Sequence, residues 1–212
     1  MFESLNEAVE YIGGFSKPSK MPCFAYSIPA QECHIGKIMR KVEGSVCSSC
    51  YALKNRYLFG NVKTALYRRF NTLKKEFWVE AFVFAVTTMK LTYFRFHDAG
   101  DLQGVWHLKN IVEIAKRCPN CKFWLPTREA SILNEYMETI SDIPENLTIR
   151  VSGTMIDGNP PIGLANKYNL CVSSVSSIES EVNCHSFKNE GKCGDCRACW
   201  DKTVFNIVYK RH

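Results

Sequence analysis

The chain of 212 residues lacks the features that would mark a membrane or secreted protein. Its longest apolar run lies around residues 82–86, whereas a membrane-spanning helix needs about 20 apolar residues. Its start, MFESLNEAVE, has no basic stretch before an apolar segment, so we expect no secretory signal. Internal repeats and low-complexity tracts are also missing. We therefore expect a cytoplasmic protein with no membrane partner, in a compartment where thiols stay reduced.

The bulk composition is that of a folded protein. Apolar residues make up 46% and charged residues 23% of the chain, as in ordinary globular domains. The formal net charge of +6 permits an anionic partner without demanding one. The length suffices for one core with a small appendage, so we predict a single domain over 1–212. It has three zones: a cysteine-containing segment (1–60), a β/α core (61–175) and a second cysteine-rich segment (176–212).

Cysteine is the unusual component of this sequence, with 11 residues. In a reducing compartment, clustered cysteines indicate metal binding before disulfides, and an odd total fits poorly with a framework made only of disulfides. Most of them fall into two groups at opposite ends of the chain. The sequence therefore predicts cysteine-rich N- and C-terminal segments that bind metal.

The C-terminal group has the spacing Cys184-x8-Cys193-x2-Cys196-x2-Cys199. A C-x2-C-x2-C run resembles the ligand spacing of bacterial ferredoxins, because a tight turn can present successive thiolates to one cluster. Zinc sites more often pair two separate C-x2-C turns. We therefore favour a [4Fe–4S] cluster here, with Cys184 as a fourth ligand and zinc as the alternative.

The N-terminal group is Cys33-x13-Cys47-x2-Cys50, preceded by Cys23. A lone C-x2-C pair is shared with thioredoxin-like redox sites, but no thioredoxin-like strand precedes this one. One cluster could draw on both groups, or each group could hold its own. Three further cysteines have other expected roles: Cys118 and Cys121 are predicted to be free thiols in a turn, and Cys171 a core residue.

The middle of the chain predicts alternating helices and strands. Residues 62–89 contain no Gly or Pro and read as one or two helices, and residues 106–115 and 132–140 have helical apolar spacing. Strands are predicted at 92–98, 122–129, 147–153 and 169–174. This alternation predicts βαβ units with a parallel sheet, either a partial (β/α) barrel or an open sheet.

Polar side chains follow each of the first three predicted strands. Since ligands bind beyond the carboxyl ends of parallel strands, we expect one catalytic site there. The candidate residues are His97, Asp98, Asp101, Arg128, Glu129, Arg150 and Ser152. The competing interpretation is that Asp98 and Asp101 are helix caps and that Arg128 and Glu129 form a surface ion pair.

Basic and aromatic residues are interleaved between residues 51 and 75, where no acidic residue occurs. Such a mixture suits phosphate pairing and base stacking, and it makes Lys54, Arg56, Arg68 and Arg69 candidate nucleic-acid contacts. We favour the alternative, in which the aromatic side chains pack inwards and the basic face of a helix is solvated.

Several motifs together resemble the phage gene product 88 family. They are SKMPC, CHIG, GSVCSSCYA, FHDAGDLQ, FWLPTRE, IRVSG and CGDCRACW, spread from Ser19 to Trp200. The family is mainly phage-encoded and has no assigned activity, so the resemblance implies a location in the host cytoplasm rather than a reaction. It also implies that the cysteines of both groups, with Cys23, belong to shared motifs.

A second resemblance is to phage proteins related to radical S-adenosylmethionine (SAM) enzymes, carried by a lone cysteine followed by C-x2-C-Tyr-Ala. It implies a partial or full (β/α)6 barrel in which Cys33, Cys47 and Cys50 hold a [4Fe–4S] cluster whose open iron binds SAM. HDAGD would then lie near the SAM amino group, and Arg150 and Ser152 near its carboxylate and ribose. The usual C-x3-C-x2-C spacing is absent, and we expect Cys23 to close the site as a fourth ligand.

Three functions remain open on the sequence alone. The favoured one is an iron–sulfur protein with redox or radical-SAM-like chemistry on an unknown small molecule. A zinc-stabilised module that binds nucleic acid or a host protein is the second. The third is a purely structural cluster in a protein that regulates a host partner.

Overall fold

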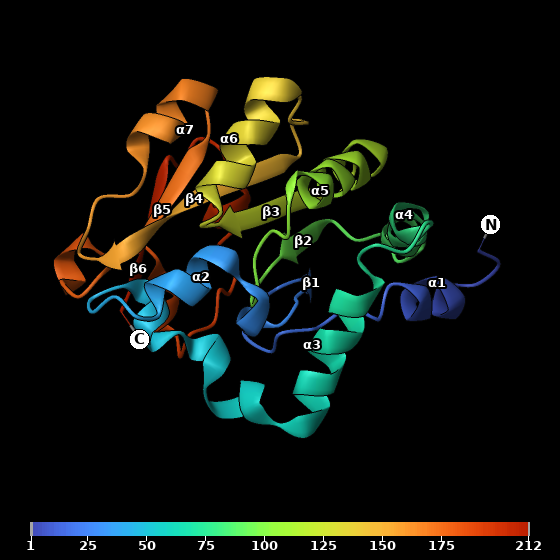
Figure 1. The fold of residues 1–212 in the computed structure, drawn as a ribbon, viewed down its shortest axis with the longest axis horizontal. Helices are drawn as coiled ribbons and strands as arrows, with labels where there is room; N and C mark the ends of the chain where they lie inside the picture. Colours follow the sequence, from blue (N-terminus) through green and yellow to red (C-terminus); the bar gives the residue numbers. More distant parts are fainter. Residues whose placement is uncertain (1, 212) are drawn as a thin grey trace.

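The computed structural model describes residues 2–211, which form a six-stranded parallel sheet with helices between the strands (Figure 1). The strands are β1 (Phe24–Tyr26), β2 (Tyr93–Phe96), β3 (Lys122–Thr127), β4 (Leu147–Ile156), β5 (Cys171–Ser176) and β6 (Asn206–Lys210). They lie in the order β1-β2-β3-β4-β5-β6, and each pairs in parallel with the next. The α/β prediction with a parallel sheet is confirmed.

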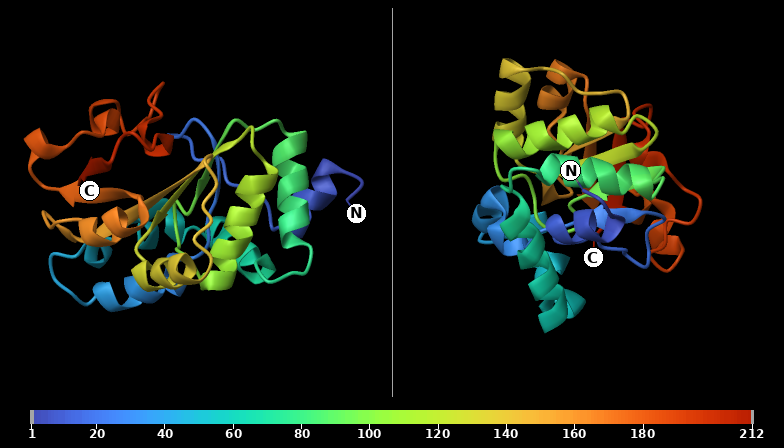
Figure 2. Two further views of the ribbon diagram at one scale, coloured as in Figure 1. Left: turned by 90° about the horizontal axis from the view of Figure 1, so that it is seen from above. Right: turned by 90° about the vertical axis from the view of Figure 1, so that its right-hand side faces the viewer.

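Five helices pack in the core on one face of this sheet: α1 (Leu5–Tyr11), α4 (Trp78–Thr88), α5 (Val105–Arg117), α6 (Ala130–Thr139) and α7 (Ile162–Tyr168). The other two, α2 (His34–Met39) and α3 (Gly60–Thr72), flank the N-terminal cysteine segment. Parallel neighbours need right-handed crossovers, so α5, α6 and α7 all fall on the same side (Figure 2, left). None of the helices within residues 2–211 is long and apolar enough to cross a membrane.

The main core lies between the helices and the sheet. On β4, Leu147, Ile149 and Val151 point into this core and are at most 2% exposed. Side chains alternate along a strand, so Thr148 and Arg150 point to the opposite face. Phe94 and Phe96 on β2 follow the same rule: in the core, Phe96 stacks on Phe82 of α4, and Phe94 meets the same ring edge-on. The core is continuous from α1 to α7.

The opposite face of the sheet is covered by the C-terminal segment that precedes β6, as Figure 2 shows. Its short 3₁₀ turn η7 (Ala198–Trp200) crosses from β2 to β4. The Trp200 indole donates to the Phe94 carbonyl at 2.8 Å, and Thr148 donates to the Trp200 carbonyl at 2.8 Å. The Trp200 ring packs edge-on against Trp124 and Tyr93.

Arg150 of β4 attaches this segment to the sheet. Its side chain is fully buried, and all three guanidinium nitrogens donate to backbone carbonyls. The acceptors are the carbonyl oxygens of Cys199, Val172, Val204, Phe205, Ala198 and Asp201. With its donors used in this way, Arg150 has none to offer a ligand. The expectation that Arg150 belongs to the catalytic site is therefore wrong, and its role is structural.

The N-terminal cysteine segment lies at the carboxyl ends of the strands (Figure 1). Four 3₁₀ turns shape it: η1 (Ala30–Glu32), η2 (Val46–Ser49), η3 (Tyr51–Leu53) and η4 (Asn55–Leu58). A backbone bridge joins Ser45 to Met155 near the end of β4, and the Ile156 amide donates to the Gly44 carbonyl at 2.9 Å. The segment thus closes over the edge of the sheet where ligands are expected.

The predicted elements of the middle zone all occur, and 62–89 resolves into the two helices α3 and α4. The sequence analysis did not predict β1, β6, α1, α2 or α7. β1 has three residues, too few for a period-2 pattern, and β6 lies in the segment assigned only to metal binding. The two outer strands of the sheet were therefore the ones missed.

Replacing Arg150 with Met should lower the free energy of unfolding by about 3 kcal/mol or more, because buried carbonyls lose charged donors. Urea unfolding measures this. Arg117→Met is the matched control: Arg117 is exposed and forms a 3.4 Å ion pair with the exposed Glu80, so a change within about 0.5 kcal/mol is expected. Equal effects of the two substitutions would contradict the structural role of Arg150.

Candidate metal centre

The N-terminal group brings Cys33, Cys47 and Cys50 together at the strand ends. Cys33 precedes α2, Cys47 lies in η2 and Cys50 follows η2. Burial raises the pKa of the Cys33 thiol, and the neighbouring Asp101, Cys50, Glu129 and Cys47 raise it further. Cys47 is 8% exposed, and burial raises its pKa while the nearby Arg128 opposes this. The three thiols therefore share one environment at the carboxyl edge.

Glu129 fixes the position of Cys33. Its buried carboxylate, 2% exposed, accepts from the backbone amides of His34 and Ile35 at 3.0 and 2.9 Å. These are the first two amides of α2, whose free N–H groups favour a negative charge. Because Cys33 immediately precedes them, the carboxylate fixes the backbone that carries this thiol. Glu129 is thus a positioning residue and not a surface ion-pair partner.

Asp101 joins the ends of β2 and β3. Its carboxylate accepts from the Thr127 hydroxyl at 2.6 Å and from the Leu102 and Arg128 amides at 2.8 Å each. Burial raises its pKa to about 6, although these hydrogen bonds oppose the rise. Thr127 in turn accepts from the Glu129 amide at 3.1 Å. One chain of contacts therefore runs from β2 through β3 to the helix that follows Cys33.

The remaining strand-end candidates are spread around this chain. Arg128 donates to the Gly153 carbonyl at 3.1 Å and lies close to Cys47. Asp98 accepts from the Tyr57 hydroxyl at 2.8 Å, while its Oδ1 atom is buried without a hydrogen-bond partner. Ser152 pairs with Ser173 of β5 at 2.9 Å. Arg128 remains beside Cys47, and Ser152 lies on the face opposite the helices. Asp98 contacts Tyr51 and Tyr57 of the turns after Cys50, and it is also a neighbour of Arg95 and Cys23.

His97 does not face the same site. Its backbone has φ of +60°, and its ring packs 5.3 Å from the ring of His107 on α5. All four ring nitrogens of this pair are buried with no hydrogen-bond partner. Burial lowers the pKa of His97 well below 6.5 and that of His107 to about 3. The expectation that His97 lines the cavity is wrong, because the left-handed backbone turns the ring into the core.

Cys23 lies with the C-terminal cysteines and not with the N-terminal group. It packs in a small cluster with Trp124, Trp200 and Cys199. Cys33 and Cys50 instead pack in a different cluster around Ala30, Ala52, Leu66 and Ala99. The expectation that Cys23 closes the first site as a fourth ligand is therefore wrong. The free thiols expected outside both groups, Cys118 and Cys121, are buried in the core, as is Cys171 at the start of β5.

The donor chemistry of the N-terminal group fits an iron–sulfur cluster. Gly36 leaves space here, because a Cβ at this position would fall 2.7 Å from Cys33 Cβ and 3.6 Å from its sulfur. Within residues 2–211, no three His, Cys, Asp or Glu side chains converge as ligands of a single metal ion. A single zinc ion holds every thiolate at about 2.3 Å, whereas in a four-iron cluster each cysteine binds a separate iron.

The nucleic-acid candidates are divided by the structure. Arg69 is 4% exposed and donates to the Ser27 carbonyl at 2.6 Å, so it cannot contact nucleic acid. Arg68 donates from its Nε atom to the Gly13 carbonyl at 3.0 Å. Lys54 and Arg56 are exposed on η4 and the residue before it. The solvated-helix interpretation therefore accounts for part of this stretch, and the predicted contact by Arg69 is wrong.

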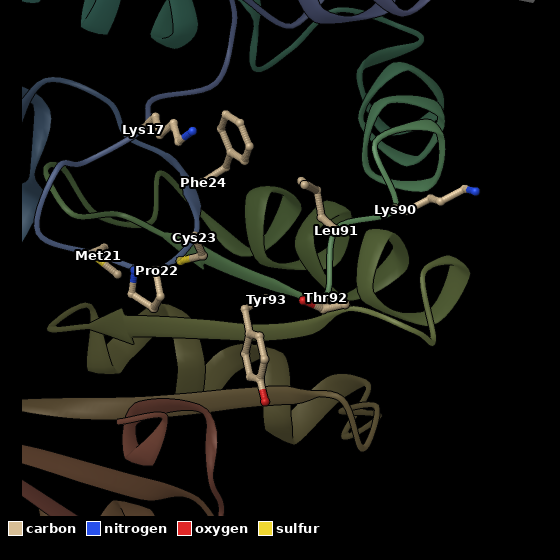
Figure 3. Close-up of a pocket in the computed structure, with 9 residues that line it drawn as sticks. All are labelled: Lys17, Met21, Pro22, Cys23, Phe24, Lys90, Leu91, Thr92 and Tyr93. Atoms are coloured by element: carbon tan, nitrogen blue, oxygen red, sulfur yellow. The ribbon is translucent and has the colours of Figure 1, made fainter. Parts of the chain in front are cut away.

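A cavity of about 440 Å³ lies at the opposite, amino-terminal edge of β1 and β2. Its lining includes Cys23, Met21, Tyr93, Lys17 and Lys90 (Figure 3). This cavity is separate from the strand-end site, since Cys23 precedes β1 and Lys90 precedes β2. It leaves unfilled space beside Cys23.

A family model described as gene product 88 matches residues 5–202. The chain belongs to the gene product 88 family. This confirms the resemblance drawn from the motifs of both cysteine groups and the strand ends. No curated protein and no solved structure matches the chain. Membership of the gene product 88 family therefore supplies kinship, and the function has to be argued from the site.

Sequence reasoning missed several residues that shape the site. Tyr57, which contacts Asp98, was treated only as part of an aromatic stretch. His107 looked like a residue on an ordinary amphipathic helix. Gly36 stands next to a motif cysteine in CHIG, and that spacing was the only signal available. Arg95, in the middle of TYFRFHD, was a charge inside a strand and could have been noticed for that reason.

Replacing Glu129 with Ala should lower the free energy of unfolding by about 2 kcal/mol, since two buried amides lose a charged acceptor. Glu129→Gln should cost less, because an amide oxygen can still accept from both amides. Glu135→Ala, exposed on the same helix α6, serves as the control. Urea unfolding of the three variants checks the order, and a Glu129→Ala protein as stable as Glu135→Ala would contradict it.

The buried histidine pair should make the protein unstable in acid. Both imidazoles have folded-state pKa values below 6.5, so their contribution is complete above pH 6.5 and is lost as pH falls below it. Each imidazole should remove about 1.4 kcal/mol per pH unit until its folded pKa is reached.

His107→Phe should flatten this dependence between pH 6.5 and 4. The raised pKa of Asp101 acts in the opposite direction, but it is present in both proteins and cancels in the difference. Unfolding free energies of wild type and variant across this range provide the test. Parallel pH profiles would rule out the histidine contribution.

Proposed function

We propose that this protein binds a [4Fe–4S] cluster through Cys33, Cys47 and Cys50 and uses SAM at the open iron for radical chemistry on a small molecule. The observation that carries the proposal is the separation of the cysteines. Three lie at the carboxyl edge of the sheet, while Cys23 packs with Trp124, Trp200 and Cys199. A three-cysteine set leaves one iron of such a cluster free to bind another ligand, as an open zinc site does.

The fold supports this assignment. Six parallel strands in sequential order, with helices on one side, are the arrangement that the radical SAM resemblance implies. In such folds the reacting groups gather beyond the carboxyl ends of the strands. The N-terminal segment with its cysteines covers that edge, through the contacts of Ser45 with Met155 and of Glu129 with α2. The N-terminal cysteine segment therefore contacts the strand ends at the edge of the sheet where we expect the reaction.

The residues around the cysteines suit a zwitterionic ligand. Asp98 has a buried carboxylate oxygen without a hydrogen-bond partner, which can accept from an ammonium group. Tyr57 donates to the other oxygen and so fixes the orientation of this carboxylate. Arg128 supplies positive charge beside Cys47, and its Nε atom is held by the Gly153 carbonyl. Asp98 would bind the SAM amino group, and Arg128 would offset the negative charge of the thiolates.

The chemistry supplied by such a cluster is a one-electron reductive cleavage of SAM, which yields methionine and, after hydrogen abstraction, 5′-deoxyadenosine. Anaerobically purified protein should be brown, with a broad absorption band near ~400 nm. After reduction with dithionite and addition of SAM, wild type should release 5′-deoxyadenosine. Cys47→Ser should release none, because the three-cysteine set is broken, and Cys118→Ala should behave as wild type.

Other outcomes would contradict the proposal. A colourless protein with stoichiometric zinc would support the zinc module instead. An iron-loaded protein whose reduced electron-spin signal is unaffected by SAM, and which releases no 5′-deoxyadenosine, would indicate a structural or electron-transferring cluster. Measuring iron, zinc and product on the same preparation separates these cases.

A further inference from the structure

Arg95 is a partly buried cation, and Asp98 is its nearby acid. It extends from β2 onto the face of the sheet that the C-terminal segment covers, and its guanidinium lies 4.3 Å from the centre of the Trp124 ring. Its Nη1 atom contacts Met21 Sδ at 3.1 Å, and its Nε atom is buried with no hydrogen-bond partner. Among the ion pairs of residues 2–211, none involves Arg95. Besides Asp98, its ionisable neighbours include Tyr209 and Cys199, so Arg95 would stabilise a thiolate at this place.

Cysteine thiols surround this cation. Trp124, on which Arg95 stacks, packs with Cys23 and Cys199 in one cluster, and Met21 packs against the same cluster. Burial raises the pKa of Cys23 to about 12, with Arg95 opposing the rise and Cys193 adding to it. Burial likewise raises the pKa of Cys199 to about 11, and Arg95 is again among the groups that oppose it. Arg95 is therefore a shared neighbour of thiols from both ends of the chain.

The two ends of the chain are tied together at this place. The Cys193 amide donates to the Lys20 carbonyl at 3.0 Å, three residues before Cys23. The Lys20 side chain lies close against Gly191, where an added Cβ would fall 2.8 Å from Lys20 Nζ. On the other side, Cys199 Sγ is 3.3 Å from the Tyr209 hydroxyl on β6. The segment before β1 and the segment before β6 thus form one structural unit.

We propose that Cys23 and three of the four C-terminal cysteines bind a second [4Fe–4S] cluster, separate from the first, with Arg95 as its counter-cation. The C-terminal donors come from Cys184, Cys193, Cys196 and Cys199. Metal-bound cysteines are thiolates, so the cluster adds negative charge that Arg95 would offset. Arg197, whose guanidinium lies 5.3 Å from the Tyr93 ring, adds positive charge at the same place. This second centre does not depend on the SAM chemistry proposed for the first.

The position of Cys23 distinguishes this arrangement from a single shared cluster. Cys23 precedes β1 and lines the cavity at the amino-terminal edge, whereas Cys33 lies with Glu129 and Asp101 at the carboxyl edge. A single centre would have to draw sulfurs from opposite edges of the sheet. Two centres require no such movement, and the space beside Cys23 lies next to the proposed second one (Figure 3).

The first test counts metal in the full-length protein. Anaerobically reconstituted wild type should hold about eight irons per chain, and both Cys23→Ser and Cys47→Ser should hold about half as many. Cys47→Ser should lose any response of the electron-spin signal to SAM, while Cys23→Ser should keep whatever response wild type has. Cys118→Ala is the matched control, since Cys118 is a buried thiol outside both groups.

Three results would overturn the second centre. They are full iron content in Cys23→Ser, a loss of the SAM response in Cys23→Ser, and zinc in place of iron in Cys47→Ser. If wild type shows no SAM response at all, the proposed function fails, but halved iron in Cys23→Ser still supports the second cluster.

If Cys23→Ser does not fold, alkylation of the Cys47→Ser protein tests whether Cys23 is a ligand. Cys23 and Cys193 should then react together only after a chelator removes iron. Reaction of Cys23 before chelation would contradict its role as a ligand.

The second test concerns Arg95. In the Cys47→Ser background, Arg95→Gln should lower the reduction potential of the remaining cluster, because a positive charge beside it is lost. Arg95→Lys keeps the charge and should shift the potential less. A purely packing role for Arg95 would not produce this order. Equal potentials in the wild-type, Gln and Lys forms would rule out the counter-cation.

Discussion

The buried guanidinium of Arg150 holds the C-terminal segment on the sheet. A parallel sheet with right-handed crossovers places its helices on one face and leaves the other uncovered. That second face cannot stay in water, because it carries Trp124 and Tyr93 as well as polar side chains. An irregular segment covers this face in place of helices. Arg150 holds that segment by donating to carbonyls within η7 and just after it. The backbone around Cys199 is therefore held in part by one side chain of β4.

At the carboxyl edge of the sheet, two carboxylates lie beside a cysteine thiol. Asp101 and Glu129 are both buried next to Cys33, and they would oppose its ionisation. Each is offset by other groups: Asp101 by the Thr127 hydroxyl and two amides, and Glu129 by the first amides of α2. Arg128 adds a compensating charge beside Cys47. The two carboxylates thus fix the backbone at the carboxyl edge of the sheet, and this backbone positions Cys33.

Sequence patterns predicted the parts of this structure that depend on local repetition. Alternating strands and helices gave the parallel sheet, and polar runs such as HDAGD and LPTRE marked the edge where Asp101 and Glu129 meet the first cysteine group. Side-chain direction was less accessible. Arg150 follows Ile149 and precedes Val151, so strand alternation already placed it on the face away from the helices, but only the fold shows that the C-terminal segment lies there. His97 was misjudged because its positive φ reverses the alternation, and Cys23 because its partners are about 170 residues away in sequence.

We propose that the cysteines form two separate centres, one at the carboxyl edge of the sheet and one beneath the face that the C-terminal segment covers. An anaerobic crystal structure with an anomalous map at the iron edge tests it most directly. We expect two distinct iron peaks, one bound by Cys33, Cys47 and Cys50 at the carboxyl ends of the strands. The other should be bound by Cys23 and the C-terminal cysteines beside Arg95. A single peak that draws on Cys23 together with Cys47, or no iron at either place, would contradict it.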